Sequence, residues 1–236
     1  MNDRNEIIRI EGIRRDFRVG SETVHALRGV SFSIREGEFV TIMGTSGSGK
    51  STLLNLLGCL DVPTSGEYYL DGVPVRRMSG NERATLRNRK IGFVFQSYNL
   101  LPQFSAWENV AMPLQIRGIP LKDRKERAME ILDLVGLRDH ALHKPTELSG
   151  GQQQRIGIAR AIVTGPAIVF ADEPTGNLDS RTGQEVMELL GRIFRKWGTT
   201  FILVSHDEEM YRYTDREIRL KDGKIEQQTL REERML

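Results

Sequence analysis

The feature that most constrains this chain is the run Gly44 to Ser51, which reads Gly-Thr-Ser-Gly-Ser-Gly-Lys-Ser and follows the apolar segment 39–43. It matches the Gly-x4-Gly-Lys-Ser/Thr pattern of a phosphate-binding loop. Glycines let the backbone turn so that successive N–H groups point at phosphate oxygens, and a following helix presents its positive N-terminus to the same anion. We therefore expect a strand, this loop and a helix over residues 51–57.

Positions within the loop have distinct expected roles. Lys50 would bridge the β- and γ-phosphates of a nucleotide, and the Ser51 hydroxyl would bind Mg²⁺. The alternative is a Gly- and Ser-rich turn that binds nothing, and the apolar strand before the run argues against it. The other expected phosphate contacts are Gly44, Thr45, Ser46, Gly47, Ser48, Gly49 and Thr52.

A pair of carboxylates, Asp172 and Glu173, comes directly after the apolar segment 168–171. A buried strand delivers such side chains to the carboxyl edge of a sheet, where open α/β sheets bind their ligands. Asp172 is expected to hold Mg²⁺, and Glu173 to polarise a water for attack on the γ-phosphate. Without the phosphate loop the pair would be read as an ordinary strand-end turn.

The word Leu-Ser-Gly-Gly-Gln at residues 148–152 repeats the logic of the phosphate loop. Small residues precede a helix that begins near Gln152, so backbone N–H groups and a helix N-terminus are again offered to an anion. One nucleotide does not need two such cradles from one chain. We therefore expect this second cradle to serve the nucleotide of another copy, with two composite sites around a twofold axis.

Together these motifs resemble the nucleotide-binding subunits of ABC transporters, and the likeness runs over essentially the whole chain. The resemblance implies that ATP and Mg²⁺ are bound and that ATP is hydrolysed. In trans, the expected nucleotide contacts are Ser149, Gly150, Gly151, Gln152 and Asp179, the last from a segment similar to the D-loop of the family.

The resemblance also assigns roles to residues outside these motifs. Gln96 is similar to the Q-loop glutamine, which contacts Mg²⁺ or the attacking water, and His206 to the switch histidine that contacts the γ-phosphate. Phe17 matches the aromatic residue that stacks on adenine, with Val24 and Ala26 beside the base, although a core role for Phe17 remains an alternative. Stacking accepts any purine face, so sharp discrimination of ATP from GTP is not expected.

Residues 87–93, 99–102, 108–114 and 171–179 are similar to the ATPases of macrolide-export and lipoprotein-release systems. The resemblance implies an integral-membrane permease as partner, a second copy as dimer partner, and a peripheral location on the cytoplasmic face of the membrane. No run of residues approaches the roughly 18 apolar residues of a membrane helix. The single cysteine, Cys59, lies in an apolar run and is expected to be a buried hydrophobe.

Strands that alternate with helices predict an α/β fold with a mainly parallel sheet, together with an N-terminal antiparallel β subdomain and an inserted helical subdomain. The resemblance implies that this arrangement is the ABC ATPase fold. We expect one domain: a core of residues 1–95 and 152–236, and a helical subdomain near 96–151.

Two other functions remain open. A soluble ABC-type ATPase acting on nucleic acid or ribosomes would be expected to carry two nucleotide domains, a zinc module or a long coiled coil. The net charge of +2 also gives no overall positive field for nucleic acid. A phosphate-loop kinase would have no need of residues 148–152.

Overall fold

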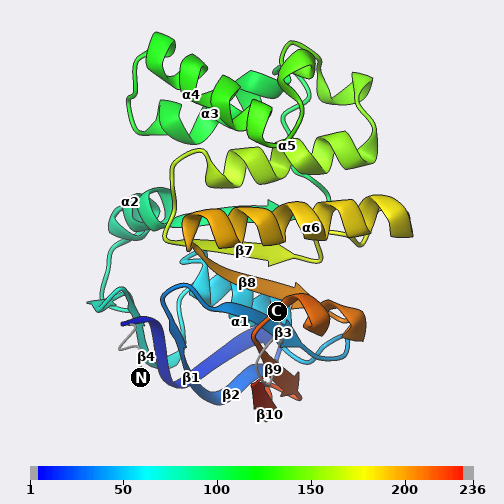
Figure 1. Cartoon of the computed structure of the whole chain (residues 1–236). Coiled ribbons are helices and arrows are strands. Elements are labelled where there is room, and N and C mark those ends of the chain that lie inside the picture. The colour runs from blue at the N-terminus through cyan, green and yellow to red at the C-terminus, as the bar shows by residue number, and fades with distance from the viewer. Residues whose placement is uncertain (1–4, 231–236) are drawn as a thin grey trace. The chain divides into compact units, whose positions relative to one another are not determined.

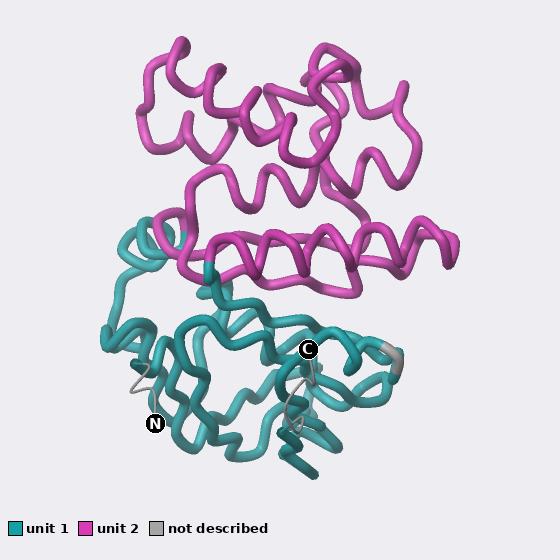
Figure 2. The backbone as a smooth tube through the Cα atoms, viewed as in Figure 1, with its two compact units in different colours: residues 1–87, 198–236 teal, residues 88–197 magenta. Residues whose placement is uncertain are grey.

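The computed structural model describes residues 5–230, and the chain divides into two compact units. Residues 1–87 and 198–236 form the first unit, and residues 88–197 form the second (Figure 2). Among the described residues, none of the helices has the length and apolar character needed to cross a membrane.

The first unit contains an antiparallel sheet in the order β2-β1-β4-β5. Strands β1 (Glu6–Val19) and β2 (Glu22–Arg35) form a long antiparallel pair, in agreement with the expected N-terminal antiparallel β subdomain. Strands β4 (Ser65–Leu70) and β5 (Val73–Pro74) form a hairpin around the turn at Asp71 and Gly72.

The same unit holds the strands that flank the phosphate loop (Figure 1). Strand β3 (Phe39–Met43) lies between β8 (Thr200–Ser205) and β9 (Arg216–Lys221) and is parallel to both, and β10 (Lys224–Leu230) pairs antiparallel with β9. All five residues of β3 are buried, so its side chains cannot shift without opening the core. Helix α1 (Lys50–Leu57) and the 3₁₀ segment η3 (Glu208–Tyr213) also belong to this unit.

The core of the first unit encloses Cys59, which is 1% exposed. The sequence-based expectation of a buried hydrophobe is therefore confirmed. Burial disfavours the thiolate and raises the pKa of Cys59 to about 11, although the nearby Tyr68 hydroxyl acts in the opposite direction. A thiol in this state is inert at neutral pH.

The second unit pairs strand β6 (Ile91–Phe95) in parallel with β7 (Ile168–Asp172). Helix α5 (Gly150–Ile162) packs against β6 and against α3 (Ala106–Ile116) and α4 (Leu121–Leu134). The approach to β6 is so close that a Cβ on Gly92 would lie 2.1 Å from the Ala161 carbonyl oxygen. The remaining elements are α6 (Ser180–Trp197) and the 3₁₀ turns η1 (Arg138–His140) and η2 (Pro145–Glu147).

The strands expected at 39–43 and 168–171 and the helix expected at 51–57 are present, and the α/β fold class is confirmed. Helix α2 (Gly80–Lys90) was not anticipated, because none of its residues is buried and it therefore lacks an apolar face. The compact units also differ in bounds from the expected core and helical subdomain. The expected division into core and helical subdomain was drawn from the motifs, whereas the compact units reflect packing, and the expected division stays a prediction.

Candidate functional site

The phosphate loop of the first unit connects β3 to α1. Helix α1 begins at Lys50, and its N-cap is Gly49 in the left-handed conformation, with φ 102°. Glycine has no side chain to accept from the first N–H groups of a helix, so these donors stay available to an anion. A Cβ on Gly49 would lie 2.7 Å from the Ala26 carbonyl oxygen, so a larger residue would displace the loop from β2.

Lys50 is folded back onto the loop that precedes it. Its Nζ atom donates to the carbonyl oxygens of Gly44 at 2.7 Å and Thr45 at 2.9 Å, and the residue is 8% exposed. The Ser48 Oγ atom is buried and has no hydrogen-bond partner among the described residues. A buried hydroxyl normally finds a partner, so this orphan atom and the adjacent ammonium fit a phosphate group as ligand.

The expected base-binding residues lie at one end of the β1–β2 pair. Phe17 is directly opposite Val24 in the strand register, and the two are 37% and 48% exposed. Phe17 is therefore not a core residue. Ala26 lies two residues further along β2, where its carbonyl oxygen meets Gly49, so the expected base and phosphate contacts adjoin within this unit. His206 also belongs to this unit, is exposed, and directly follows β8.

In the second unit, the acidic pair and Gln96 are brought to the same ends of two paired strands. Asp172, the last residue of β7, is in register with Phe95, the last residue of β6, so Gln96 and Glu173 follow at equivalent positions. Glu173 has φ 42°, a left-handed conformation that costs a non-glycine residue about 1–3 kcal/mol. Such strain is concentrated at functional sites, and Glu173 is the residue expected to act as base.

The side chain of Gln96 is held by the loop that follows the acidic pair. Its Nε2 atom lies 3.4 Å from Asn177 Oδ1, and Asn177 Nδ2 donates to the Gln96 carbonyl oxygen at 3.1 Å. A Cβ on Gly176 would lie 2.6 Å from the Gln96 Nε2 atom. The expected Q-loop residue is therefore connected to the segment that carries Asp172 and Glu173.

The word at 148–152 forms the start of α5, as expected. Ser149 is the N-cap: its Oγ accepts from the Gln152 N–H at 3.3 Å, and Gln152 Oε1 accepts from the Ser149 N–H at 2.9 Å. This is a capping box, in which each residue satisfies a backbone donor of the other. Gly150 and Gly151 form the first turn, and Ser149 remains exposed.

Asp179 directly precedes α6 in the same unit. Its Oδ1 accepts from the Thr182 N–H at 3.0 Å, and the hydrogen bonds from Thr182 lower the pKa of Asp179 below its usual value. Within its own chain this carboxylate therefore serves the N-terminus of α6. Its expected contact with a nucleotide in trans stays a prediction.

Other residues that support these motifs were missed at the level of sequence. Arg160 on α5 donates to the carbonyl oxygens of Asn99 at 2.5 Å and Tyr98 at 2.8 Å, and both Tyr98 and Asn99 are left-handed. Gln154 is fully buried and donates to the Pro174 carbonyl oxygen at 2.7 Å, next to the acidic pair. The sequence of a helix shows that it carries a polar residue, but it does not show which distant carbonyl oxygen that residue will contact.

Comparison with known proteins agrees with these motifs. Residues 27–176 match the model of the family described as ABC transporter. The chain is 47% identical over 219 residues to a lipoprotein-releasing system ATP-binding protein LolD of Bacteroides fragilis, covering 93% of this chain and 100% of that protein. It is 51% identical over 223 residues to a macrolide export ATP-binding/permease protein MacB of Syntrophobacter fumaroxidans, covering 94% of this chain but only 31% of that longer relative.

A solved structure is also similar. It is the dimeric post-hydrolysis state of the ATP-binding cassette MJ0796 of Methanocaldococcus jannaschii, bound to ADP and Pi. The TM-score is 0.87 with 44% identity, over 94% of this chain and 98% of that chain, which shows the ABC ATPase fold. The chain therefore belongs to the ABC transporter family, as an ATP-binding cassette that hydrolyses ATP.

Proposed function

We propose that two copies of this chain close around two ATP molecules and drive a membrane permease of the macrolide-export or lipoprotein-release type. The main supporting observation is that one chain holds two candidate anion-binding helix N-termini that are built in different ways. One is the phosphate loop with Lys50, and the other is the exposed start of α5 at Ser149. The second cradle is explained if it receives the γ-phosphate of the partner's ATP.

Each residue has a role in this proposal. Lys50, Ser48 and the loop N–H groups bind the phosphates, and Phe17 with Val24 binds the base. Glu173 accepts the proton of the attacking water, and Gln96 and His206 orient the reacting groups. Mg²⁺ held by Ser51, Gln96 and Asp172 would neutralise charge on the β- and γ-phosphates.

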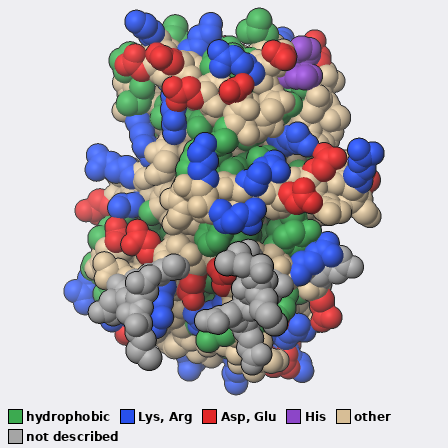
Figure 3. All heavy atoms as spheres, in the orientation of Figure 1, with side chains coloured by type: hydrophobic (Ala, Val, Ile, Leu, Met, Phe, Trp, Pro, Cys, Tyr) green, Lys and Arg blue, Asp and Glu red, His purple; other side chains and the backbone are tan. Residues whose placement is uncertain are grey.

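The partner class is supported by the named relatives at about 50% identity, one a macrolide export ATP-binding/permease protein and the other the ATP-binding protein of a lipoprotein-releasing system. These names favour transport over action on nucleic acid or ribosomes. Both charge signs are dispersed over the face in Figure 3, in keeping with the small net charge. The chain is then a peripheral subunit on the cytoplasmic face, attached through its permease.

The decisive variant is Glu173→Gln. It should bind ATP, hydrolyse it about 10²–10³-fold more slowly, and accumulate as a dimer in Mg-ATP, because closure is separated from the proton transfer that ends it. Light scattering and phosphate release measure the two effects. Glu130→Gln, at an exposed position on α4, is the control and should behave as wild type. A Glu173→Gln protein that stays monomeric at saturating Mg-ATP contradicts the shared sites.

The permease is tested separately. The chain should co-purify from membranes with an integral-membrane protein encoded beside it, and that protein should alter its rate of ATP hydrolysis. Recovery with ribosomes or nucleic acid instead would overturn the proposed partner class.

A further inference from the structure

A cationic side chain, that of Arg15, lies over the exposed ring of Phe17. Arg15 is two residues earlier on β1 and therefore on the same face of the strand. Its Cζ atom lies 4.5 Å from the centre of the Phe17 ring. A guanidinium over an aromatic ring is attracted by the negative charge of the ring face. Phe17 is 37% exposed, so the cation does not cover the whole ring.

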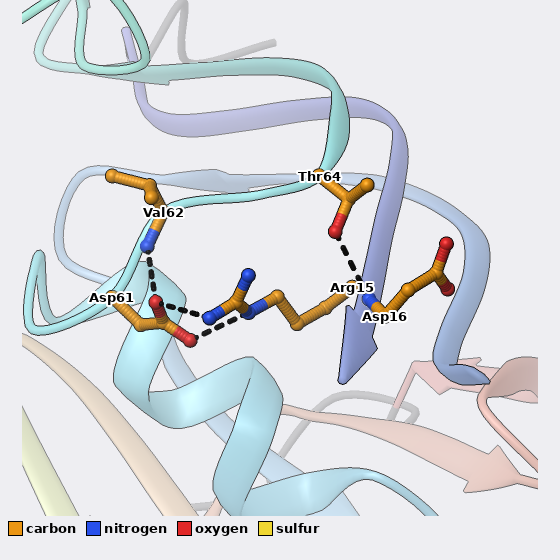
Figure 4. A network of polar contacts seen from close by, with 5 residues as sticks. All are labelled: Arg15, Asp16, Asp61, Val62 and Thr64. Carbon is orange, nitrogen blue, oxygen red and sulfur yellow. Dashed lines mark hydrogen bonds and ion pairs between the residues drawn. The ribbon is translucent and has the colours of Figure 1, made fainter. Parts of the chain in front are cut away.

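The guanidinium of Arg15 is itself fixed (Figure 4). Its Nε donates to Asp61 Oδ2 at 2.7 Å and its Nη2 donates to Asp61 Oδ1 at 2.9 Å. The same Oδ1 accepts from the Val62 N–H at 2.7 Å, which sets the direction of the carboxylate. Both side chains are about three-quarters buried. A bidentate pair of this kind fixes the plane of the guanidinium as well as its position.

Asp61 also connects this arrangement to the phosphate loop. It lies four residues after the end of α1, the helix that begins at Lys50. A second link is parallel to the first, because the Asp16 N–H donates to Thr64 Oγ1 at 3.0 Å (Figure 4). The strand that carries Phe17 is thus tied at two adjacent residues to the segment that leaves the phosphate-binding helix.

We propose that Arg15 is a positioning residue of the nucleotide site, which holds the Phe17 ring for stacking on a purine base. The inference rests on the proposed function, because it requires Phe17 to bind the base. The cation on one face withdraws electron density and restricts the ring, so the opposite face stacks better on an electron-rich purine. Asp61 transmits the position of α1 to the ring, so base and phosphate contacts keep a fixed separation.

The test compares a ligand with a base to one without. Binding of Mg-ADP and of inorganic tripolyphosphate is measured by titration calorimetry for wild type and Arg15→Met. ADP should bind about three- to tenfold more weakly, the range expected for a cation–π contact, and tripolyphosphate should bind unchanged. Arg9→Met is the matched control, because Arg9 is also on β1 and its Cζ lies 4.4 Å from the ring centre of Tyr69 on β4. The ADP affinity of this variant should not change.

A double variant separates positioning from simple destabilisation. If Arg15 acts through the ring, Phe17→Ala combined with Arg15→Met should bind ADP no more weakly than Phe17→Ala alone. Additive losses, unchanged or tighter ADP binding in Arg15→Met, or an equal loss for tripolyphosphate would overturn the inference. If Phe17→Ala itself leaves ADP affinity unchanged, the base site of the proposed function fails as well. Should Arg15→Met not fold, Arg15→Lys keeps the charge, loses the bidentate pair, and should show a smaller loss of the same kind.

Discussion

Helices α1 and α5 both begin within a run of glycine and serine residues, yet their backbone donors are used differently. At α1 the cap is Gly49 in the left-handed conformation, which offers no side-chain acceptor. At α5 the cap is Ser149 in an extended conformation, with φ −65° and ψ 161°, and its oxygen already accepts from Gln152. The first helix leaves its N–H groups to a ligand, whereas the second satisfies one of them internally.

This difference suits two different tasks. The phosphate loop surrounds its ligand with backbone donors, a buried Ser48 hydroxyl and Lys50, so it can hold a phosphate within one chain. At the start of α5, Ser149 is exposed, and the capping box is complete without a ligand. The Ser149 hydroxyl can still donate. We expect such a surface to contribute only when a phosphate is delivered to it by another subunit.

The largest effect should come from Gly49→Ala. The added Cβ would lie 2.7 Å from the Ala26 carbonyl oxygen, and the alanine would have to adopt φ 102°. The loop must therefore move, and its backbone N–H groups would no longer point at one phosphate. ADP affinity should fall by about 100-fold or more, because several charge-assisted hydrogen bonds are lost together. Calorimetric titration measures it. Gly198→Ala, with φ +62° and open space around it, should leave binding intact; ADP binding within threefold of wild type for Gly49→Ala would contradict this view of the loop.

Ser149→Ala should separate the two cradles. ADP binding should be unchanged, while ATP-dependent dimers of the Glu173→Gln protein should weaken about tenfold, as expected for loss of a hydrogen bond to a charged group. Helix α5 should lose about 1 kcal/mol with its cap. Ser105→Ala at α3 is the control: it removes a hydroxyl bonded to Glu108 at 2.6 Å and should lower stability without affecting dimers. Equal dimer loss in both variants would mean that stability, not phosphate contact, is responsible.

Gln152→Glu should have smaller effects, and they should be opposite in sign for stability and for dimer formation. A carboxylate can still accept from the Ser149 N–H, and negative charge is favourable at a helix N-terminus, so Tm should be equal or slightly higher. The same charge repels a phosphate, and dimers in Mg-ATP should weaken about three- to tenfold at low salt. Gln115→Glu, at an exposed position of α3, should not change them. Stronger dimers would exclude a phosphate at the start of α5.

The smallest effect concerns the pH dependence of stability, which should differ between the cap of α3, where Glu108 is charged, and the cap of α5, where Gln152 is neutral. Hydrogen bonds from the Ser105 hydroxyl and N–H lower the pKa of Glu108 below its usual value. A lowered folded-state pKa stabilises the fold above the unfolded-state pKa, and this contribution is lost as pH falls through the folded value. Glu108→Gln should therefore lower Tm at pH 7 by the equivalent of roughly 0.5 kcal/mol after solvent screening, and the difference should vanish in acid. A difference that persists at low pH would show that the charge of Glu108 is not its source.

How far the sequence predicts this protein depends on whether a feature is local. Strand β3, the phosphate loop and the capping word at Ser149 and Gln152 depend on neighbouring residues, so their patterns are visible in the sequence. Helix α2 was missed, since no residue in it is buried and no periodicity marks it. The left-handed pair Tyr98 and Asn99 gave no signal either, because its conformation is held by Arg160 from another helix.

By itself, the sequence determined the chemistry that each motif can offer: an apolar strand, a turn of glycines and a helix create anion donors wherever they occur together. Only the tertiary structure decided which distant residues hold these motifs in place. Arg15 meets Asp61 across 46 positions of chain, and Gln154 meets Pro174 across 20. Such pairs depend on how strands and helices pack, and many equally polar residues could have served as partners.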